Sequence, residues 1–284
     1  MLYSIFVEPF SYAFMKKALA GCLCLSFSCG PVGLFLILRR MSLMGDALSH
    51  SVLPGAAIGY VLTGLNLKAM ALGGIISSLL VALFSGLTSR YTKMKEDASF
   101  AGYFIMSVAI GVLIISTRHN AIDVMHILFG SALAVNTASL QLIAVFSSIT
   151  LFVLAVTYRG LVLDCFDPDF FKQIGGRPNF YHSLFLLLVV LNLVAGFQAL
   201  GTLLSLSIML LPPLAARFWT ERLLQTLILT VTFAVFSGWS GLLLSYHFNL
   251  PTGPCISLVA GVLYLTSLLF GSKGSVLHTI GTKK

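Results

Sequence analysis

Nine predominantly apolar stretches follow one another along this chain, most of them about 20 residues long. A membrane-spanning helix needs about that many apolar residues, whereas barrel strands alternate in shorter segments. Only helices and closed barrels satisfy their backbone groups within lipid, so the continuous runs favour helices. We therefore predict an all-α integral membrane protein, a polytopic bundle of eight or nine transmembrane helices. The candidate segments are 18–38, 46–65, 69–89, 98–116, 138–158, 183–201, 202–216, 223–246 and 254–271.

Proline and small residues mark two of these segments. The 202–216 segment is short and contains Pro212 and Pro213, which remove helix hydrogen bonds and clash with the preceding turn. We expect a short or broken helix there, buried in protein. In the second segment, Gly55 and Gly59 follow Pro54, and small residues four apart allow helices to approach closely.

The composition supports one membrane domain. Of 284 residues, 58% are hydrophobic and 9% are charged, whereas soluble domains carry about 25% charged residues. No polar stretch is long enough for a separate soluble domain, so residues 1–284 are predicted to form a single transmembrane domain with lipid around it. Glu8 precedes Lys16 and Lys17, an order that does not favour a cleavable signal peptide.

The basic residues indicate topology. The net charge of +8 arises from Lys and Arg in short loops, so it argues for membrane orientation and against nucleic-acid binding. If all nine segments cross, most of the 17 Lys and Arg residues fall in alternate loops. The positive-inside rule then places residues 39–44, 90–97 and 159–182 in the cytoplasm.

Asp46 and His50 stand out because Asp46 is the only acidic residue between Glu8 and Glu96. A spacing of four residues places both side chains on one helix face, one turn apart. Charged groups at membrane depth are costly and are usually functional or paired. Carboxylate oxygen and imidazole nitrogen suit a first-row divalent cation such as Zn²⁺ or Mn²⁺. We predict Asp46 and His50 as ligands of a metal ion.

A structural role for the same residues stays open at this point. Asp46 is close enough in sequence to pair with Arg39 or Arg40, or to cap the second helix, which would leave His50 as a core histidine. Two ligands are also too few for a tight site. A homodimer would bring two Asp and two His together at a two-fold axis and form an oxygen–nitrogen cage.

A second polar cluster lies within residues 118–136. His119, Asp123 and His126 recur at spacings of four and three, which one helix face can carry. One interpretation is an outer metal relay. The other, which we favour, is an interfacial amphipathic helix that keeps its polar face in water.

Residues 164–177 contain the start and stop signals of a short helix. Asp167 is suited to the N-cap, Pro168 to the first turn, and Gly175 or Gly176 to a left-handed C-terminus. Phe170, Phe171 and Ile174 are spaced to form one apolar face. The segment is predicted either to dock a cytoplasmic partner or to lie on the membrane surface.

No enzyme motif accompanies these features. The chain has no G-x-x-x-x-G-K-[ST] phosphate-binding loop, no H-E-x-x-H and no G-x-S-x-G. We therefore expect no catalytic residues and no permanently bound cofactor.

The motifs together resemble the membrane-spanning permease subunit of bacterial zinc/manganese ABC importers. The most specific match is the sequence RRMSLMGDALSH at residues 39–50. Further matches occur in the same order along nearly the whole chain: Leu128-Phe129-Gly130-Ser131, Phe166-Asp167-Pro168 to Gly175, Gly201-Thr202-Leu203-Leu204, Leu211-Pro212-Pro213 with Ala216-Arg217, and Leu250-Pro251-Thr252-Gly253-Pro254.

The resemblance implies a homodimeric permease in the bacterial cytoplasmic (inner) membrane, with cytoplasmic ABC ATPase subunits and an extracytoplasmic metal-binding protein. Asp46 and His50 match the positions that hold the transported ion, zinc or manganese and by chemistry also iron. Residues 167–176 match the coupling helix that meets the ATPase. Two residues depart from the pattern: Gly176 stands where an apolar residue is commoner, and Phe171 where a small one is commoner.

Two other functions remain to be weighed. An ion-driven secondary carrier for divalent metals would need no ATPase partner. An intramembrane hydrolase would use Asp46 and His50 around a metal, but the chain lacks a recognisable nucleophile or base motif.

Overall fold

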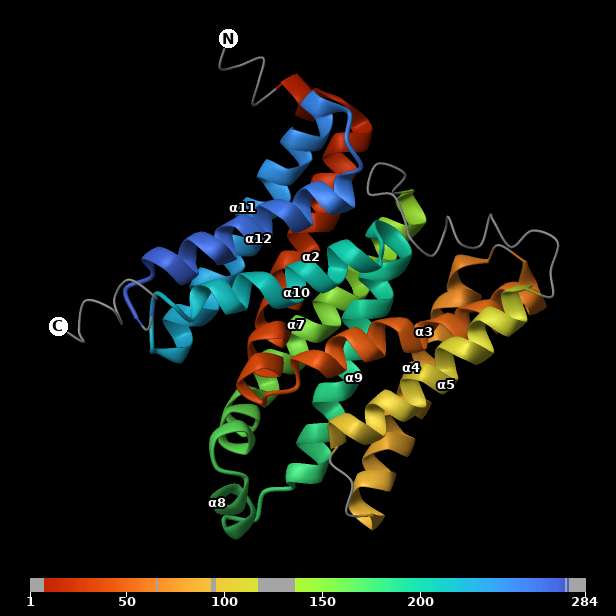
Figure 1. The fold of residues 1–284 in the computed structure, drawn as a ribbon, viewed down its shortest axis with the longest axis vertical. Coiled ribbons are helices and arrows are strands. Elements are labelled where there is room, and N and C mark those ends of the chain that lie inside the picture. Colours follow the sequence, from red (N-terminus) through yellow and green to blue (C-terminus); the bar gives the residue numbers. More distant parts are fainter. Residues whose placement is uncertain (1–7, 65, 93–95, 117–135, 274, 276–284) are drawn as a thin grey trace.

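The computed structural model describes residues 8–64, 66–92, 96–116, 136–273 and 275, and the regular elements found in these ranges are helices (Figure 1). A short 3₁₀ turn, η1 (Glu8–Ser11), precedes the first long helix. The α-helices are α2 (Ala13–Leu38), α3 (Ser42–Thr63), α4 (Leu67–Tyr91), α5 (Glu96–Ser116), α7 (Thr137–Phe166), α8 (Pro168–Gln173), α9 (Pro178–Leu200), α10 (Thr202–Ala216), α11 (Leu223–Phe248) and α12 (Thr252–Phe270).

The predicted all-helical membrane fold is confirmed, and each of the nine predicted segments corresponds to one long helix. Six helices in the described ranges are long and apolar enough to cross a membrane, namely α2, α4, α7, α9, α11 and α12. Residues Ala98–Ile114 of α5 and helix α10 are shorter apolar stretches. Helix α3, which carries Asp46 and His50, is not among the six, because its Ser, Gly, Asp and His residues lower its hydropathy.

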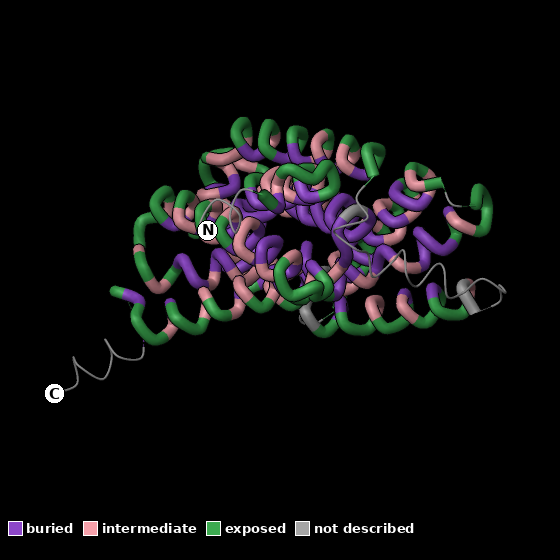
Figure 2. The backbone as a smooth tube through the Cα atoms, turned by 90° about the horizontal axis from the view of Figure 1, so that it is seen from above, coloured by how far each residue is buried: buried purple, intermediate pink, exposed green. Residues whose placement is uncertain are grey.

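The long helices form two packed groups. Helices α3, α4 and α5 lie side by side at one flank, whereas α2, α10, α11 and α12 pack together at the other (Figure 1). Helices α7 and α9 pack on each other and on α2, and α9 also contacts α4. Buried residues line the inner sides of the helices, while exposed residues cover their outer faces, as a lipid-embedded bundle requires (Figure 2).

Glycine allows α3 and α4 to approach closely. A Cβ on Gly55 would overlap the carbonyl of Gly73, and a Cβ on Gly73 would overlap the carbonyl of Gly55. Across the same contact, the hydroxyl of Ser77 donates a 2.7 Å hydrogen bond to the carbonyl of Ser51. The close-packing role predicted for the Gly55 region is therefore confirmed, and its partner is α4.

Helix α10 is short, as the sequence predicts. It is separated from α9 at Gly201, whose φ of 98° favours glycine, and it continues through Pro212 and Pro213 to Ala216. Pro213 has no N–H to donate to the carbonyl of Met209. Gly33 of α2 faces that carbonyl, and a Cβ there would overlap its oxygen. The missing side chain thus lets α2 pack against the interrupted turn of α10.

Candidate metal centre

Asp46 and His50 lie one turn apart in α3, on the same helix face. Oδ1 of Asp46 is 3.7 Å from Nε2 of His50. Two tetrahedral ligands of one ion, each with a bond of about 2.1 Å, are roughly 3.4 Å apart. The two side chains are therefore spaced to share one divalent cation with little adjustment.

The pair is open to the outside of a single chain. The Asp46 and His50 side chains are 52% and 37% exposed. The imidazole ring lies 5.8 Å, centroid to centroid, from the ring of Phe104 in α5. An exposed carboxylate on an apolar helix is costly against lipid, so this face needs a cover that is not lipid.

The pair lies beside the middle of helix α4. Leu48, which stands between the two residues in α3, accepts a 3.4 Å hydrogen bond at its carbonyl from the hydroxyl of Ser78. Ser78 is at the middle of the apolar stretch Leu67–Ser89 of α4. Asp46 and His50 themselves lie in the second and third turns of α3, which begins at Ser42.

Within the described residues, Asp46 lies beside His50 and forms no ion pair with Arg39 or Arg40. Met41 is the N-cap residue of α3, and Asp46 lies inside that helix. Arg39 pairs with Asp164 of α7, since its Nη2 donates to Oδ2 of Asp164 at 2.7 Å. Within the described ranges, no group of three or more His, Cys, Asp and Glu side chains is placed to hold a metal ion. One chain therefore offers two candidate ligands, fewer than a complete metal site needs.

The short helix predicted within residues 164–177 is α8, and its ends have the predicted chemistry. Oδ1 of Asp167 accepts a 2.9 Å hydrogen bond from the N–H of Phe170, and Pro168 occupies the first turn. Gly175 adopts a φ of 85°, and the N–H of Gly176 donates to the carbonyl of Phe171 at 2.9 Å, which closes a Schellman motif. Residues 164–166 belong to the end of α7.

The expected single apolar face of α8 is wrong in one respect, because Phe171 points away from its two partners. Phe171 is 7% exposed and meets the ring of Tyr181 edge-on at 5.2 Å. Phe170 and Ile174 are 48% and 56% exposed. In so short a helix the three bulky side chains do not share one face. Phe171 packs inward and anchors the helix, whereas Phe170 and Ile174 stay exposed.

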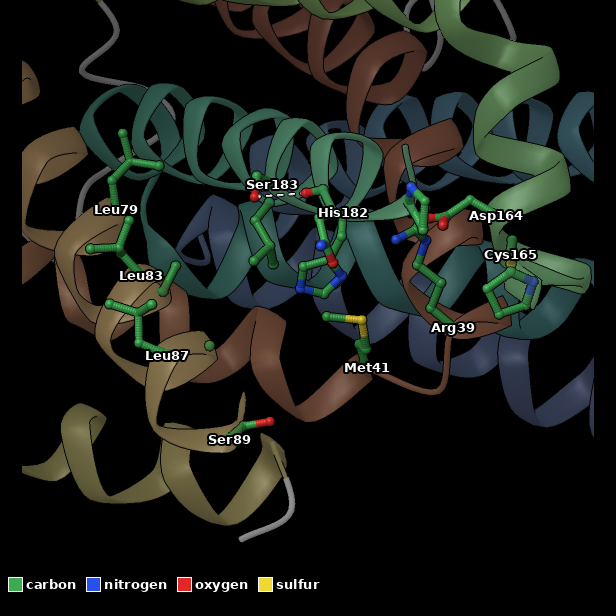
Figure 3. A pocket seen from close by; sticks show the side chains of 16 residues that line it. Arg39, Met41, Leu79, Leu83, Leu87, Ser89, Asp164, Cys165, His182 and Ser183 are labelled. Carbon is green, nitrogen blue, oxygen red and sulfur yellow. Dashed lines mark hydrogen bonds and ion pairs between the residues drawn. The ribbon is translucent and has the colours of Figure 1, made fainter. Parts of the chain in front are cut away.

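A cavity of about 710 Å³ lies beside the Arg39–Asp164 pair, between α4 and the α7–α9 region (Figure 3). Leu79, Leu83 and Leu87 of α4 line one wall, and Arg39, Asp164 and His182 line the polar side. Because residues 39–41, 86–89, 164–168 and 178–183 meet around this space, three predicted cytoplasmic loops lie at the same end of the molecule.

Sequence reasoning missed the Arg39–Asp164 pair. The available signal was Asp164 itself, an acid in the last turn of an apolar 30-residue helix, since such an acid usually has a cationic partner. The predicted outer cluster of His119, Asp123 and His126 falls outside the described residues and stays a prediction.

A comparison with known families identifies what this architecture belongs to. Residues 11–271 match the model of a family described as the ABC 3 transport family. The chain belongs to the ABC 3 transport family. This confirms the resemblance drawn from the sequence and makes the chain a multi-pass permease of the inner membrane, a transport subunit of the divalent-metal ABC importers.

Relatives within the ABC 3 transport family agree with this assignment. The chain is 33% identical over 268 residues to the manganese transport system membrane protein MntC of Listeria monocytogenes, with 94% of each chain covered. It is 30% identical over 270 residues to the chelated iron transport system membrane protein YfeD of Yersinia pestis, covering 95% of this chain and 90% of that one.

Solved structures show the same fold. The structure of PsaBC from Streptococcus pneumoniae in complex with Fab has a chain that superposes with a TM-score of 0.86 at 30% identity, with 99% of this chain and 100% of that chain covered. An inward-facing conformation of a putative metal-chelate type ABC transporter gives a TM-score of 0.69 at 15% identity, covering 89% and 85%.

Proposed function

We propose that two copies of this permease face each other through α3 and pass a divalent metal ion between them, with Asp46 and His50 of each copy as its ligands. The observation that carries the proposal is the 3.7 Å pair on an open helix face, beside the middle of α4. The two ligands of one chain become four across a two-fold axis, which is the number that a tetrahedral Zn²⁺ site uses.

The surface of α3 supports a second copy as its cover. Leu43 is exposed one turn before Asp46 on the same side of this helix, so the carboxylate has an apolar flank. Apolar flanks can pack against the same flanks of a symmetry mate, while the two carboxylates approach a shared cation. Lipid would satisfy the flanks but not the carboxylate.

Manganese is the first cargo to test. Asp and His accept Mn²⁺, Zn²⁺ and Fe²⁺, because carboxylate oxygen and imidazole nitrogen are ligands for each of them. The two relatives described above are named as manganese and chelated iron transport proteins. No residue of the pair selects among these ions by itself, so selectivity would depend on the geometry of the complete site.

The energy for transport would come from separate subunits. We place the contact with a cytoplasmic ABC ATPase at α8, because this capped helix exposes Phe170 and Ile174 at the end of the molecule that carries the basic loops. An extracytoplasmic metal-binding protein would deliver the ion on the opposite side. ATP binding would move α8, and the bundle would expose the Asp46–His50 site to each side in turn.

Uptake of radioactive Mn²⁺ into vesicles that contain the whole complex tests the proposal. An Asp46→Asn, His50→Ala double variant should abolish ATP-dependent uptake at normal membrane levels. Glu221→Gln is the matched control, because this exposed acid lies between α10 and α11 and not in α3. Its Oε1 is 3.5 Å from Nζ of Lys273. Normal uptake by the double variant would refute the site, and uptake without ATP would favour an ion-driven carrier.

A further inference from the structure

The Arg39–Asp164 pair is a buried ion pair that joins the end of α2 to the end of α7. The side chains are 7% and 5% exposed, and Nη2 and Oδ2 are 2.7 Å apart. The guanidinium carbon of Arg39 also lies 4.6 Å from the ring centroid of Phe185 in α9. Charges buried this far from water stay together, because separating them leaves each uncompensated.

The arginine end of the pair is fixed to the helix that carries the proposed metal ligands. Arg39 is the C-cap residue of α2, and Arg40 follows with a φ of 58°. The N–H of Met41 donates to the carbonyl of Leu36 at 2.9 Å, so the chain turns tightly from α2 into α3. Asp46 lies in the second turn of α3. A displacement of Arg39 therefore displaces the start of this helix.

The aspartate end is fixed to the proposed ATPase contact. Asp164 lies in the last turn of α7, three residues before Asp167, the cap of α8. Tyr181 of α9 packs on Gly160 of α7, where a Cβ would overlap its ring, and on Phe171 of α8 at 5.2 Å. The end of α7, helix α8 and the start of α9 thus form one packed unit.

We propose that the Arg39–Asp164 pair is a strut that carries the displacement of α8 to the metal-binding helix α3. The proposal rests on the function proposed above. Helix α3 packs chiefly on α4 and α5 and less on α9, whereas α7 packs on α2 and α9, so direct packing between α3 and α7 is slight. The cavity separates α4 from the α7–α8 junction at this level (Figure 3). Arg39 and Asp164 are positioning residues that neither bind metal nor touch the ATPase.

An ion pair transmits a displacement between helices better than apolar packing does. Apolar side chains slide past one another at little cost, whereas a buried ion pair resists both separation and sliding because its attraction depends on short distances. In the described residues, Nε of Arg39 is buried without a hydrogen-bond partner, so the guanidinium is held mainly by Asp164 and Phe185. Loss of Asp164 would free this group from α7.

The test measures Mn²⁺ ions imported per ATP hydrolysed by the whole complex in vesicles, together with Mn²⁺ binding to the purified permease–ATPase complex. The variant is Arg39→Met with Asp164→Leu, since apolar residues of similar size often replace a buried pair without loss of folding. We expect Mn²⁺ binding and ATP hydrolysis to persist while the transport ratio falls about tenfold, the scale of a typical coupling between sites.

The matched control is Arg40→Asn, which removes the adjacent exposed charge and keeps a residue that tolerates positive φ. It should leave the transport ratio unchanged. An unchanged ratio in the assembled double variant overturns the strut, and so does loss of Mn²⁺ binding in that variant. If the double variant does not assemble, Asp164→Asn is the deciding variant, because it keeps the shape of the side chain. A lowered transport ratio in Asp164→Asn supports the strut, and an unchanged ratio overturns it.

Mn²⁺ binding tests the metal site, whereas the number of Mn²⁺ ions imported per ATP tests the strut. If Asp46→Asn binds Mn²⁺ as the unaltered protein does, the proposed metal site is wrong. If that variant loses Mn²⁺ while the Arg39 and Asp164 variants transport normally for each ATP, the site stands and only the strut is wrong.

Discussion

Gly176 fits against the ring of Phe171, and a Cβ at position 176 would lie 2.5 Å from Cε2 of that ring. These are the two residues at which the sequence resemblance led us to expect a departure from the family pattern. The bulk of Phe171 occupies the space that a side chain at 176 would need.

Gly176→Leu is therefore expected to destabilise the permease by about 1–3 kcal/mol, the cost of overpacking a filled site. Combining it with Phe171→Ala should cost less than the sum of the two single losses, because the smaller side chain vacates the space. Thermal unfolding of the two single variants and the double variant in detergent gives the coupling energy. Additive effects would show that the two residues do not share this space.

The adjacent phenylalanines of α8 should differ in what their loss does. Phe170→Asp is expected to leave the folded permease intact but weaken ATPase binding, because Phe170 is exposed. Phe171→Ala should lower stability by about 3 kcal/mol, because it empties a buried site. Co-purification of the ATPase subunit and thermal unfolding separate the two effects. Normal ATPase binding by Phe170→Asp would argue against docking at α8.

Gly33→Ala should separate α2 from α10, because the added methyl group overlaps the carbonyl oxygen of Met209 and neither backbone can yield easily. We expect a loss of thermal stability of about 1–3 kcal/mol and lower transport. Gly261→Ala is the control, since a Cβ there meets nothing within 4 Å. Equal stability of the two variants would contradict the close contact of α2 with α10.

Acidification should weaken Mn²⁺ binding, because protons compete with the cation for the imidazole nitrogen of His50. Only the neutral imidazole can be a ligand, so the affinity measured at an acid pH should be lower than the affinity measured at neutral pH. Calorimetric titration of the permease–ATPase complex measures this, and His50→Gln should show weaker binding with less dependence on pH. Equal affinity at both pH values would exclude His50 as a ligand.

The sequence predicted the helices well because a long apolar segment in lipid satisfies its backbone hydrogen bonds by forming a helix. All nine segments became helices, and the cap of α8 was readable because Asp167, Pro168 and Gly175 each act within a few residues of their own position. The Asp46–His50 pair was readable for the same reason, since a spacing of four fixes a shared face.

What the sequence could not predict depends on packing between segments far apart in the chain. The partner of Arg39 is 125 residues away, and local spacing suggested Asp46 instead. Phe171 and Ile174 share a spacing typical of one face, but the ring of Tyr181 draws Phe171 inward. The position of the pair beside the middle of α4 likewise depends on the contact of Leu48 with Ser78 in that helix.

The most direct test of the central claim is equilibrium binding of Mn²⁺ to the purified permease–ATPase complex without the extracytoplasmic protein. We expect about one bound ion for each two permease chains, as a site on a two-fold axis requires. The bound ion should be lost in the Asp46→Asn, His50→Ala double variant and kept in Glu221→Gln. The same amount of bound Mn²⁺ in the double variant and the unaltered protein would contradict the account.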